Sequence, residues 1–366
     1  MRILKSPSSA AWWALFGLGT VLLQLLARYQ PEWVELWYSR GLFQGIRYVL
    51  DGTLGRLPFP PFYLFWIAVI AFWVGVYRRR PAAGGFWPKI RYGLLRLAGF
   101  LGLLVGLFCW LWGFHYARVP LTTQLGLQLQ PLDSTALWQE LLTETLALDS
   151  LRSSLVGADT NALEDRQFWP PRAEDTIRAA VEKWLAGENF PVGGRVRARY
   201  LYPAGLLFTF GTSGVYWPFT GEGNLEAGLH PLRQLPTMAH EMSHGYGFAD
   251  EGVCNFIAYA ACSEHPNAYI AYSTRLDYWR QLARACRLLN DERYKTQYRP
   301  TIPPGVLADE RAVRRQHDKF GELAPAWRYQ AYDTYLKAQG LAAGMDSYGE
   351  VLVLVRAWRK GRQGKW

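Results

Sequence analysis

Three apolar runs near the beginning of the sequence constrain the fold more than any other feature. Residues 10–27, 61–77 and 97–114 contain no charged side chain, and each run approaches the roughly 20 residues that a helix needs to cross a bilayer. Half of the 366 residues are hydrophobic and 17 are tryptophan, which is rich for a soluble protein. The sequence therefore predicts three transmembrane helices in residues 1–118 and a separate domain in residues 119–366.

The first apolar run resembles a signal peptide, because it follows Arg2 and Lys5. No small-residue cleavage site follows it, and two further runs do, so we expect an uncleaved membrane anchor.

Basic residues between the second and third runs predict the orientation in the membrane. Residues 78–96 hold six Lys or Arg and no acid, whereas residues 28–60 mix four Arg with three acids. Cytoplasmic loops carry the excess of Lys and Arg. We therefore expect a multi-pass protein of the cytoplasmic (inner) membrane, with its N-terminus in the cytoplasm and residues 119–366 outside it. The net charge of +10 is then explained by topology, with the lipid bilayer rather than nucleic acid as the partner.

The second constraining feature is the sequence His240-Glu241-Met242-Ser243-His244, which has the form H-E-x-x-H. Residues four apart share one face of a helix, so both imidazoles can point at one metal ion. In zincins the intervening Glu takes a proton from the attacking water. The motif uses two of only six His in the chain. We expect a helix that starts near Pro236, with Thr237 as its N-cap, and closes at Gly245 and Gly247.

A catalytic zinc needs a third protein ligand, and two acids follow the motif. Read as H-E-x-x-H-x-x-G-x-x-D, the sequence places Asp250 in the third position, as in a metzincin pattern. The alternative is Glu251, which opens an apolar helix through Cys262 and reaches farther than Asp. Asn255 lies four residues later on the same face, where it can support a ligand. We favour Glu251 and keep Asp250 as the alternative.

At these motifs the chain resembles an uncharacterised bacterial family of membrane-anchored, zincin-like proteins, catalogued as a domain of unknown function and similar to HExxH gluzincin metallopeptidases. The similar segments are Ser213–Asn224, Ala239–Phe248, Glu251–Tyr259, Tyr332–Lys337 and Ser347–Gly349. The resemblance implies a zinc site and a membrane anchor, and it implies no particular substrate. Gly252 and Val253 stand where many members carry acids, which removes a competing ligand and favours Glu251.

The domain after residue 118 is expected to be α+β, mostly helical with a small sheet. Apolar periodicity predicts helices at 134–148 and 174–186, and four more between residue 269 and 359. Alternation and β-branched or aromatic residues predict strands at 196–202, 206–210 and 215–219. Residues 214–224 are a candidate edge strand for an extended substrate, and residues 356–362 read as a solvated tail that could touch lipid headgroups.

Together these features predict a membrane-anchored zinc metallopeptidase that hydrolyses a peptide or protein substrate. His240, His244 and Glu251 would bind one Zn²⁺ per chain, and Glu241 would act as the general base. The alternative is a zinc-stabilised binding or sensing module that hydrolyses nothing.

Secondary candidates are weaker. Tyr246, His265 and Tyr348 could each stabilise an oxyanion, and Glu222 could support the site. Cys262 and Cys286 are expected to be buried thiols, with a disulfide as the alternative.

Overall fold

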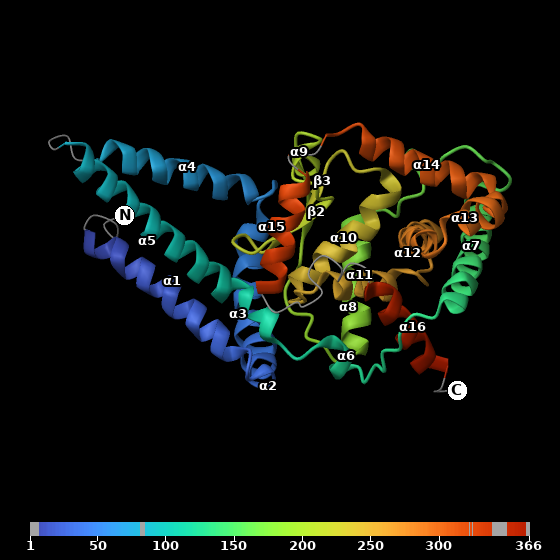
Figure 1. Ribbon diagram of the computed structural model, residues 1–366, viewed down its shortest axis with the longest axis horizontal. Coiled ribbons are helices and arrows are strands. Elements are labelled where there is room, and N and C mark those ends of the chain that lie inside the picture. The colour runs from blue at the N-terminus through green and yellow to red at the C-terminus, as the bar shows by residue number, and fades with distance from the viewer. Residues whose placement is uncertain (1–6, 81–84, 322, 324, 339–349, 364–366) are drawn as a thin grey trace. The chain divides into compact units, whose positions relative to one another are not determined.

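The structure is a computed structural model that describes residues 7–80, 85–321, 323, 325–338 and 350–363 (Figure 1). It forms two compact units. The first comprises Met1–Val119 and two short segments from later in the chain, Gly193–Arg195 and Trp217–Gly221. The second comprises Pro120–Val192, Val196–Tyr216 and Glu222–Trp366. The first unit thus includes a turn that lies in sequence just before the His-rich motif.

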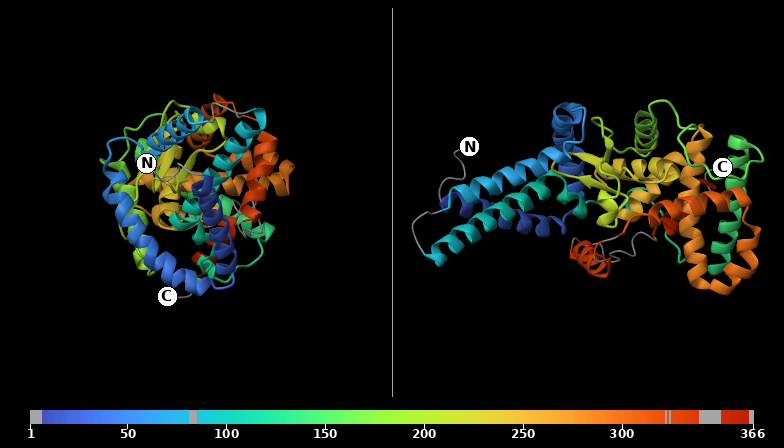
Figure 2. Two further views of the ribbon diagram at one scale, coloured as in Figure 1. Left: turned by 90° about the vertical axis from the view of Figure 1, so that its left-hand side faces the viewer. Right: turned by 90° about the horizontal axis from the view of Figure 1, so that it is seen from above.

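Every regular element described between residues 7 and 119 of the first unit is a helix, and α1 lies alongside α5 (Figures 1 and 2). Its elements are α1 (Pro7–Ala27), α2 (Pro31–Trp33), the π-helical η1 (Val34–Leu42), α3 (Phe43–Gly52), η2 (Leu54–Arg56), α4 (Phe62–Arg78), α5 (Phe86–Leu111) and η3 (Gly113–Ala117). Helix α5 begins at Phe86, well before the third apolar run at residues 97–114, so it includes half of the basic residues that precede that run. Lys89, Arg91 and Arg96 favour helix as well as any unbranched side chain does, so their charge did not end it.

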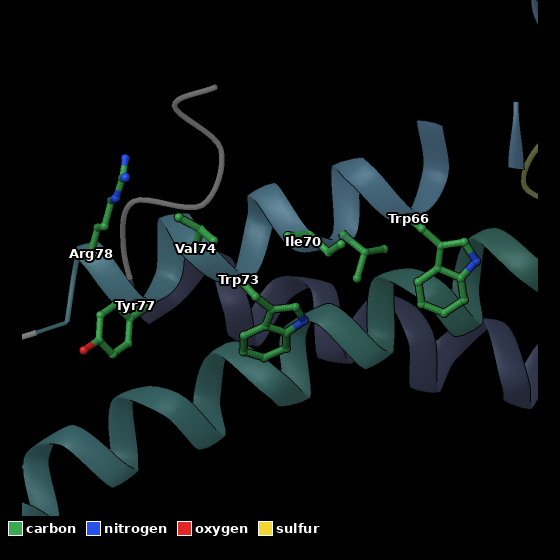
Figure 3. A pocket seen from close by; sticks show the side chains of 7 residues that line it. Trp66, Ile70, Trp73, Val74, Tyr77 and Arg78 are labelled. Atoms are coloured by element: carbon green, nitrogen blue, oxygen red, sulfur yellow. The ribbon is translucent and has the colours of Figure 1, made fainter. Parts of the chain in front are cut away.

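Two helices of this unit, Ser9–Ala27 and Phe86–Leu111, are long and apolar enough to cross a membrane. The third expected span forms as α4, an apolar helix of 17 residues, which is shorter than the other two. In Figure 3, Trp66, Ile70, Trp73 and Tyr77 follow one another along α4, and Arg78 points away from them at its end. These side chains line an open apolar groove that contains no cluster of polar groups. By length and composition, two of the three expected spans are thus observed, and the third stays an expectation.

Close contact between α1 and α5 depends on glycine. A Cβ atom added to Gly102 would lie 2.3 Å from the carbonyl oxygen of Trp13, and one added to Gly17 would lie 2.5 Å from the Cα atom of Gly102. Gly99 meets the backbone of Ala10 in the same way. Small residues let two membrane helices approach closely enough for their backbones to touch. These glycines therefore fix the separation of the two candidate spans.

We expect Gly102→Ala to destabilise the chain, because its methyl group meets backbone that cannot move without separating the helices. Overpacking of this kind typically costs about 1–3 kcal/mol. Gly93→Ala is the matched control on the same helix, since its added Cβ meets nothing within 4 Å. Thermal unfolding of the detergent-solubilised chain should show a lower Tm for Gly102→Ala alone. Equal Tm values for both variants would contradict the glycine-dependent contact.

The second unit is mostly helical with one small sheet, as expected for an α+β domain. Its strands are β1 (Ala198–Leu201), β2 (Gly214–Trp217) and β3 (Glu222–Glu226), in the order β1-β3-β2, and β1 pairs with β3 in parallel. Trp217 itself groups with the first unit. The helices are α6 (Leu121–Gln124), α7 (Ser134–Val156), α8 (Ala173–Gly187), α9 (Leu206–Thr209), α10 (Pro231–Gly245), α11 (Glu251–Cys262), α12 (Ala268–Leu289), α13 (Asp291–Arg293), η4 (Tyr294–Tyr298), η5 (Arg299–Thr301), α14 (Pro304–Asp318), α15 (Pro325–Ala338) and α16 (Glu350–Gln363).

Helix α10 occupies the middle of the second unit. It packs against β3 on one side and against α8, α11 and α12 on the others. Leu235, Ala239 and Met242 are fully buried on its inner faces. The motif that it carries is therefore held by the most densely surrounded element of this unit.

Two expectations about the second unit were wrong. Residues 206–209 form the short helix α9 rather than a strand, because the buried Glu226 carboxylate accepts hydrogen bonds from the amides of Leu207 and Phe208 at its start. The expected solvated tail is part of α16, whose Val355 and Trp358 are buried and whose Arg359 pairs with Glu140 and Glu144. The apolar spacing of that helix outweighed its charge.

A candidate metal centre

Helix α10 starts five residues earlier than expected. Pro231 takes the first helical position, where its missing N–H costs nothing, and the His230 side chain accepts a hydrogen bond from Leu232 N at 3.3 Å. Pro236 lies inside the helix rather than at its start, and Thr237 is not its cap. Gly245 is the last helical residue, and Gly247 follows with a φ of +89°, as its lack of a side chain permits. The helix thus presents His240, Glu241 and His244 from its last two turns.

We expect the cap at His230 to make stability pH-dependent. Burial lowers the pKa of His230 to about 4, whereas a histidine in the unfolded chain has a pKa of about 6.5. Between these two pH values the unfolded chain therefore binds more protons than the folded chain. Stability should be complete above about pH 6.5 and fall by up to about 3 kcal/mol as the pH drops toward 4. His230→Asn keeps a good N-cap that does not titrate, so it should lose less Tm between pH 7 and pH 5 than the parent chain. Equal losses would contradict this role.

Three potential metal ligands converge beside this helix. His240 and His244 come from α10, and Glu251 is the first residue of α11, and their ligand atoms all lie within 4.8 Å of one another. The two Nε2 atoms are 3.2 Å apart. Glu251 Oε2 lies 3.1 Å from His240 Nε2 and 3.5 Å from His244 Nε2. The structure therefore brings together the three residues that we expected to bind zinc.

Hydrogen bonds on the far side of each imidazole fix its orientation. His244 Nδ1 donates to the carbonyl oxygen of Phe248 at 2.7 Å, since that oxygen can only accept. His240 Nδ1 lies 2.8 Å from Oδ1 of Asn255, the residue expected to support it from α11. With the ring hydrogen at Nδ1, Nε2 of a neutral imidazole presents a lone pair to the cluster. Metal-binding histidines are typically oriented in this way.

The donor set fits a zinc ion. Zinc bonds of about 2.0–2.1 Å in a tetrahedral arrangement place neighbouring donor atoms about 3.3–3.4 Å apart. The three observed separations of 3.1, 3.2 and 3.5 Å lie close to that value. Two imidazoles and one carboxylate are also a ligand set used by catalytic zinc, which keeps a fourth position open.

The charge state of Glu251 suits a ligand. Burial alone would raise the pKa of this carboxyl, but the imidazoles of His244 and His240 beside it hold its pKa well below the usual range. Glu251 is therefore a carboxylate at neutral pH. The side chain of His240 is 12% exposed, against 7% for His244 and 9% for Glu251, so the cluster is nearly enclosed and most open at His240.

Glu241 lies against the sheet, and two glycines make room for it. A Cβ atom on Gly214 of β2 would lie 2.4 Å from Glu241 Oε1, and one on Gly223 of β3 would lie 2.6 Å from Glu241 Cβ. The Glu241 side chain is buried, and its Oε2 has no hydrogen-bond partner among the described residues. Burial raises its pKa to about 7. A fixed, buried carboxyl with one unpaired oxygen is suited to exchange a proton with a bound molecule.

The alternative third ligand has another role in the structure. Asp250 is the N-cap of α11, and its Oδ1 accepts a hydrogen bond from Val253 N at 2.8 Å. Asp250 thereby satisfies a backbone N–H group at the start of α11, the helix that presents Glu251. The geometry therefore favours Glu251 over Asp250.

The secondary candidates are engaged away from the cluster or lie outside the described residues. Tyr246 donates to Glu182, His265 Nδ1 accepts from Asn267 N, and Glu222 pairs with Arg199. Tyr348, with the similar segment Ser347–Gly349, lies outside the described residues. Cys262 and Cys286 are free, buried thiols, so the alternative of a disulfide between them is wrong.

Sequence reasoning missed three contributors to the site. They are the Phe248 carbonyl, which orients His244, and Gly214 and Gly223, which accommodate Glu241. Gly214 was expected only as the start of an edge strand, and β2 is indeed at one edge of the sheet. The one signal in the sequence was that both glycines lie in short β-like segments. A glycine inside a strand often marks the close approach of another group.

Comparison with known proteins identifies a family and no function. A family model described as "Protein of unknown function (DUF3810)" matches residues 38–355, a range that includes the whole cluster and part of each unit. Comparisons with curated proteins and with solved structures find no match. The expected membership of an uncharacterised family is thereby confirmed, while metal binding and peptidase activity remain to be argued from the site itself.

Proposed function

We propose that this chain, which belongs to the DUF3810 family of proteins of unknown function, is a zinc-dependent metallopeptidase anchored in a membrane by its N-terminal helices. His240, His244 and Glu251 would hold the metal. The observation that carries the proposal is the buried Glu241 carboxyl beside them, whose Oε2 has no partner in the part of the chain that the structure describes. A burial of this kind costs stability, and a site that serves only to bind zinc has no use for it.

Zinc held there would supply a Lewis acid for a peptide carbonyl and would lower the pKa of an attacking water. Glu241 would accept the proton of that water at Oε2 and later deliver it to the leaving amine. A carboxyl whose pKa is raised toward 7 by burial can perform both transfers near neutral pH. Gly214 and Gly223 would keep this carboxyl in one position throughout.

A peptide substrate would bind in extended form along β2. This strand lies at the edge of the sheet, which is where an extended peptide can add as a further strand. Pairing with the main chain of a peptide gives affinity with little dependence on its sequence. Because Gly214 of the same strand touches Glu241, the paired peptide would pass next to the general base.

The proposed placement is a multi-pass protein of the cytoplasmic membrane, with α1, α4 and α5 as three spans. The six Lys and Arg between Arg78 and Arg96 support a cytoplasmic position for the α4–α5 connection. The N-terminus would then also be cytoplasmic, and the cluster would face the outside. A peptide or protein close to the membrane surface is the substrate that such a placement favours.

The test is the metal content and peptidase activity of the full chain in detergent. We expect about one zinc per chain by elemental analysis, with cleavage of dye-labelled casein that stops with a chelator and returns with added zinc. A well-folded chain that contains no metal would overturn the proposal. One zinc per chain without cleavage of any unfolded substrate would favour the alternative, a zinc-stabilised binding or sensing module.

A further inference from the structure

The segment Pro31–Gly52 of the first unit exposes an uncharged, apolar face. It is helical without a break through α2, η1 and α3. Its most exposed large side chains are apolar or aromatic: Trp33 (60%), Leu36 (59%), Trp37 (61%), Leu42 (49%), Tyr48 (77%) and Val49 (61%). From Trp33 to Val49, every residue classed as exposed is one of these or a glycine. A surface helix of a soluble protein instead exposes its charged and polar residues and buries its apolar ones.

Four of the five charged residues of this segment are held in ion pairs, and the fifth, Glu32, is exposed in its first turn. Glu35 accepts hydrogen bonds from Arg118 at 2.8 Å and from Arg40 at 2.9 Å. Arg47, with 1% of its surface exposed, pairs with Asp51 and donates to the carbonyl oxygen of Gly221. Each of these paired charges thus has its partner inside the first unit, and from Trp33 to Val49 no exposed residue is charged. Such an arrangement is stable only where the outer face avoids water.

The segment is too polar to cross a bilayer. It holds five charged side chains, and it is not among the candidate spans. It begins shortly after α1 ends at Ala27, and it runs crosswise to α1, α4 and α5 (Figures 1 and 2). A helix that lies across the direction of neighbouring spans, with one apolar face, matches the geometry of a helix in the membrane interface.

We propose that Pro31–Gly52 is an interfacial helix that inserts its exposed face into the boundary between lipid headgroups and acyl chains. Trp and Tyr concentrate at this depth because their rings are amphipathic, and Trp33, Trp37 and Tyr48 all lie on the exposed face. Helix α1 of the same unit also exposes large apolar side chains, among them Leu18 and Leu22. A surface that binds another protein typically has polar, hydrogen-bonding groups around its rim, whereas a face that inserts among lipids needs none. The proposal rests on the proposed membrane anchoring and adds a second kind of contact with the bilayer.

The inner face of this helix holds two later segments of the first unit, Gly193–Arg195 and Trp217–Gly221. Arg47 holds the carbonyl of Gly221, and the Asp51 carboxylate accepts a hydrogen bond from Arg195 N at 2.7 Å. In the same turn, Phe219 stacks on Phe65 of α4 with ring centroids 4.8 Å apart. The turn Trp217–Gly221, which joins β2 to β3, is therefore fastened to helices of the membrane unit. An interfacial position of Pro31–Gly52 would hold this turn at the bilayer surface.

The experiment measures the depth of single nitroxide labels in the full chain, reconstituted in phosphatidylethanolamine–phosphatidylglycerol vesicles. The four native cysteines are buried, so an introduced cysteine is labelled selectively. The test positions are Trp33→Cys, Trp37→Cys and Tyr48→Cys. The references are Leu18→Cys within a candidate span and Thr160→Cys, an exposed residue of the second unit. Collisions with oxygen report lipid, and collisions with a water-soluble nickel chelate report solvent.

All three test labels are expected about 5–10 Å inside the headgroup boundary, shallower than Leu18 and shielded from the nickel chelate relative to Thr160. Labels as accessible to the chelate as Thr160 would overturn the proposal. Labels shielded from both reagents and coupled to one another would also overturn it, because they would show contact with a second copy of the chain. Neither result depends on metal or activity, so failure here is distinguishable from failure of the proposed function.

Discussion

Glu251→Ala is expected to abolish stoichiometric metal binding, whereas Asp250→Asn is expected to leave it intact. Glu251 supplies the only carboxylate of the described His–His–Glu cluster, and its Oε2 lies 3.1 Å from His240 Nε2. Loss of a group that merely orients a ligand typically weakens binding about 10–100-fold, so loss of a ligand should cost more. Elemental analysis of the purified full chains, with titration of the metal-free forms, measures the difference.

The Asp250→Asn variant distinguishes two possible roles of this residue, that of a metal ligand and that of the N-cap of α11. Asn is as good an N-cap as Asp, so it can still accept the hydrogen bond from Val253 N and keep α11 folded. It removes the negative charge that a metal would require of a third ligand. Loss of metal in Asp250→Asn together with retention in Glu251→Ala would contradict the assignment and favour the metzincin-like pattern. Similar circular dichroism spectra of the two variants would exclude unfolding as the cause of any loss.

The cluster itself could be predicted from sequence because its determinants are local. Residues four apart on a helix share a face whatever surrounds them, which placed His240 and His244 together. The acid that opens the next apolar helix was likewise visible in the sequence, and so was Asn255 one turn later. What the sequence did not reveal is the carbonyl of Phe248, because every residue has a carbonyl and only the fold selects one.

Strand β3 shows why the sheet was predicted less well. Its residues, Glu222 to Glu226, include glycine, asparagine and two acids, all of which are poor strand formers. The strand exists because the sequence-distant Arg199 pairs with Glu222, and because the Glu226 carboxylate accepts N–H groups from Gly205 and Leu207. These partners lie about 20 residues away, so no local window contains the information.

The helix from Pro31 to Gly52 was overlooked for a related reason. Its mixture of acids and bases suggested an extracytoplasmic loop, because charge was read as exposure. In the structure Glu35 and Arg47 are buried in ion pairs, whereas Leu36, Trp37 and Leu42 between them are exposed. Composition gives the number of charged residues but not the side of the helix on which they lie. That side depends on which residues share the helix face that packs against the rest of the unit.

The largest expected effect on activity is that of Glu241→Gln, which should retain one zinc per chain and lose turnover by about 10²–10⁴-fold or more. The amide has the same shape, so it still fits beside Gly214 and Gly223. It cannot take up a proton, and Oε2 of Glu241 is the buried, unpaired atom assigned that task. Release of dye-labelled peptides from casein, normalised to zinc content, measures the loss.

Glu264→Gln is the matched control, since it makes the same chemical change at an exposed carboxylate that pairs with Arg362. It should retain both zinc and turnover, because a surface ion pair of this kind contributes at most about 1 kcal/mol to stability. Full turnover in Glu241→Gln would assign proton transfer to another group. Loss of zinc in Glu241→Gln would mean that this carboxyl supports the metal rather than the reaction. Only retained zinc with lost turnover fits a general base that is positioned by two glycines of the sheet.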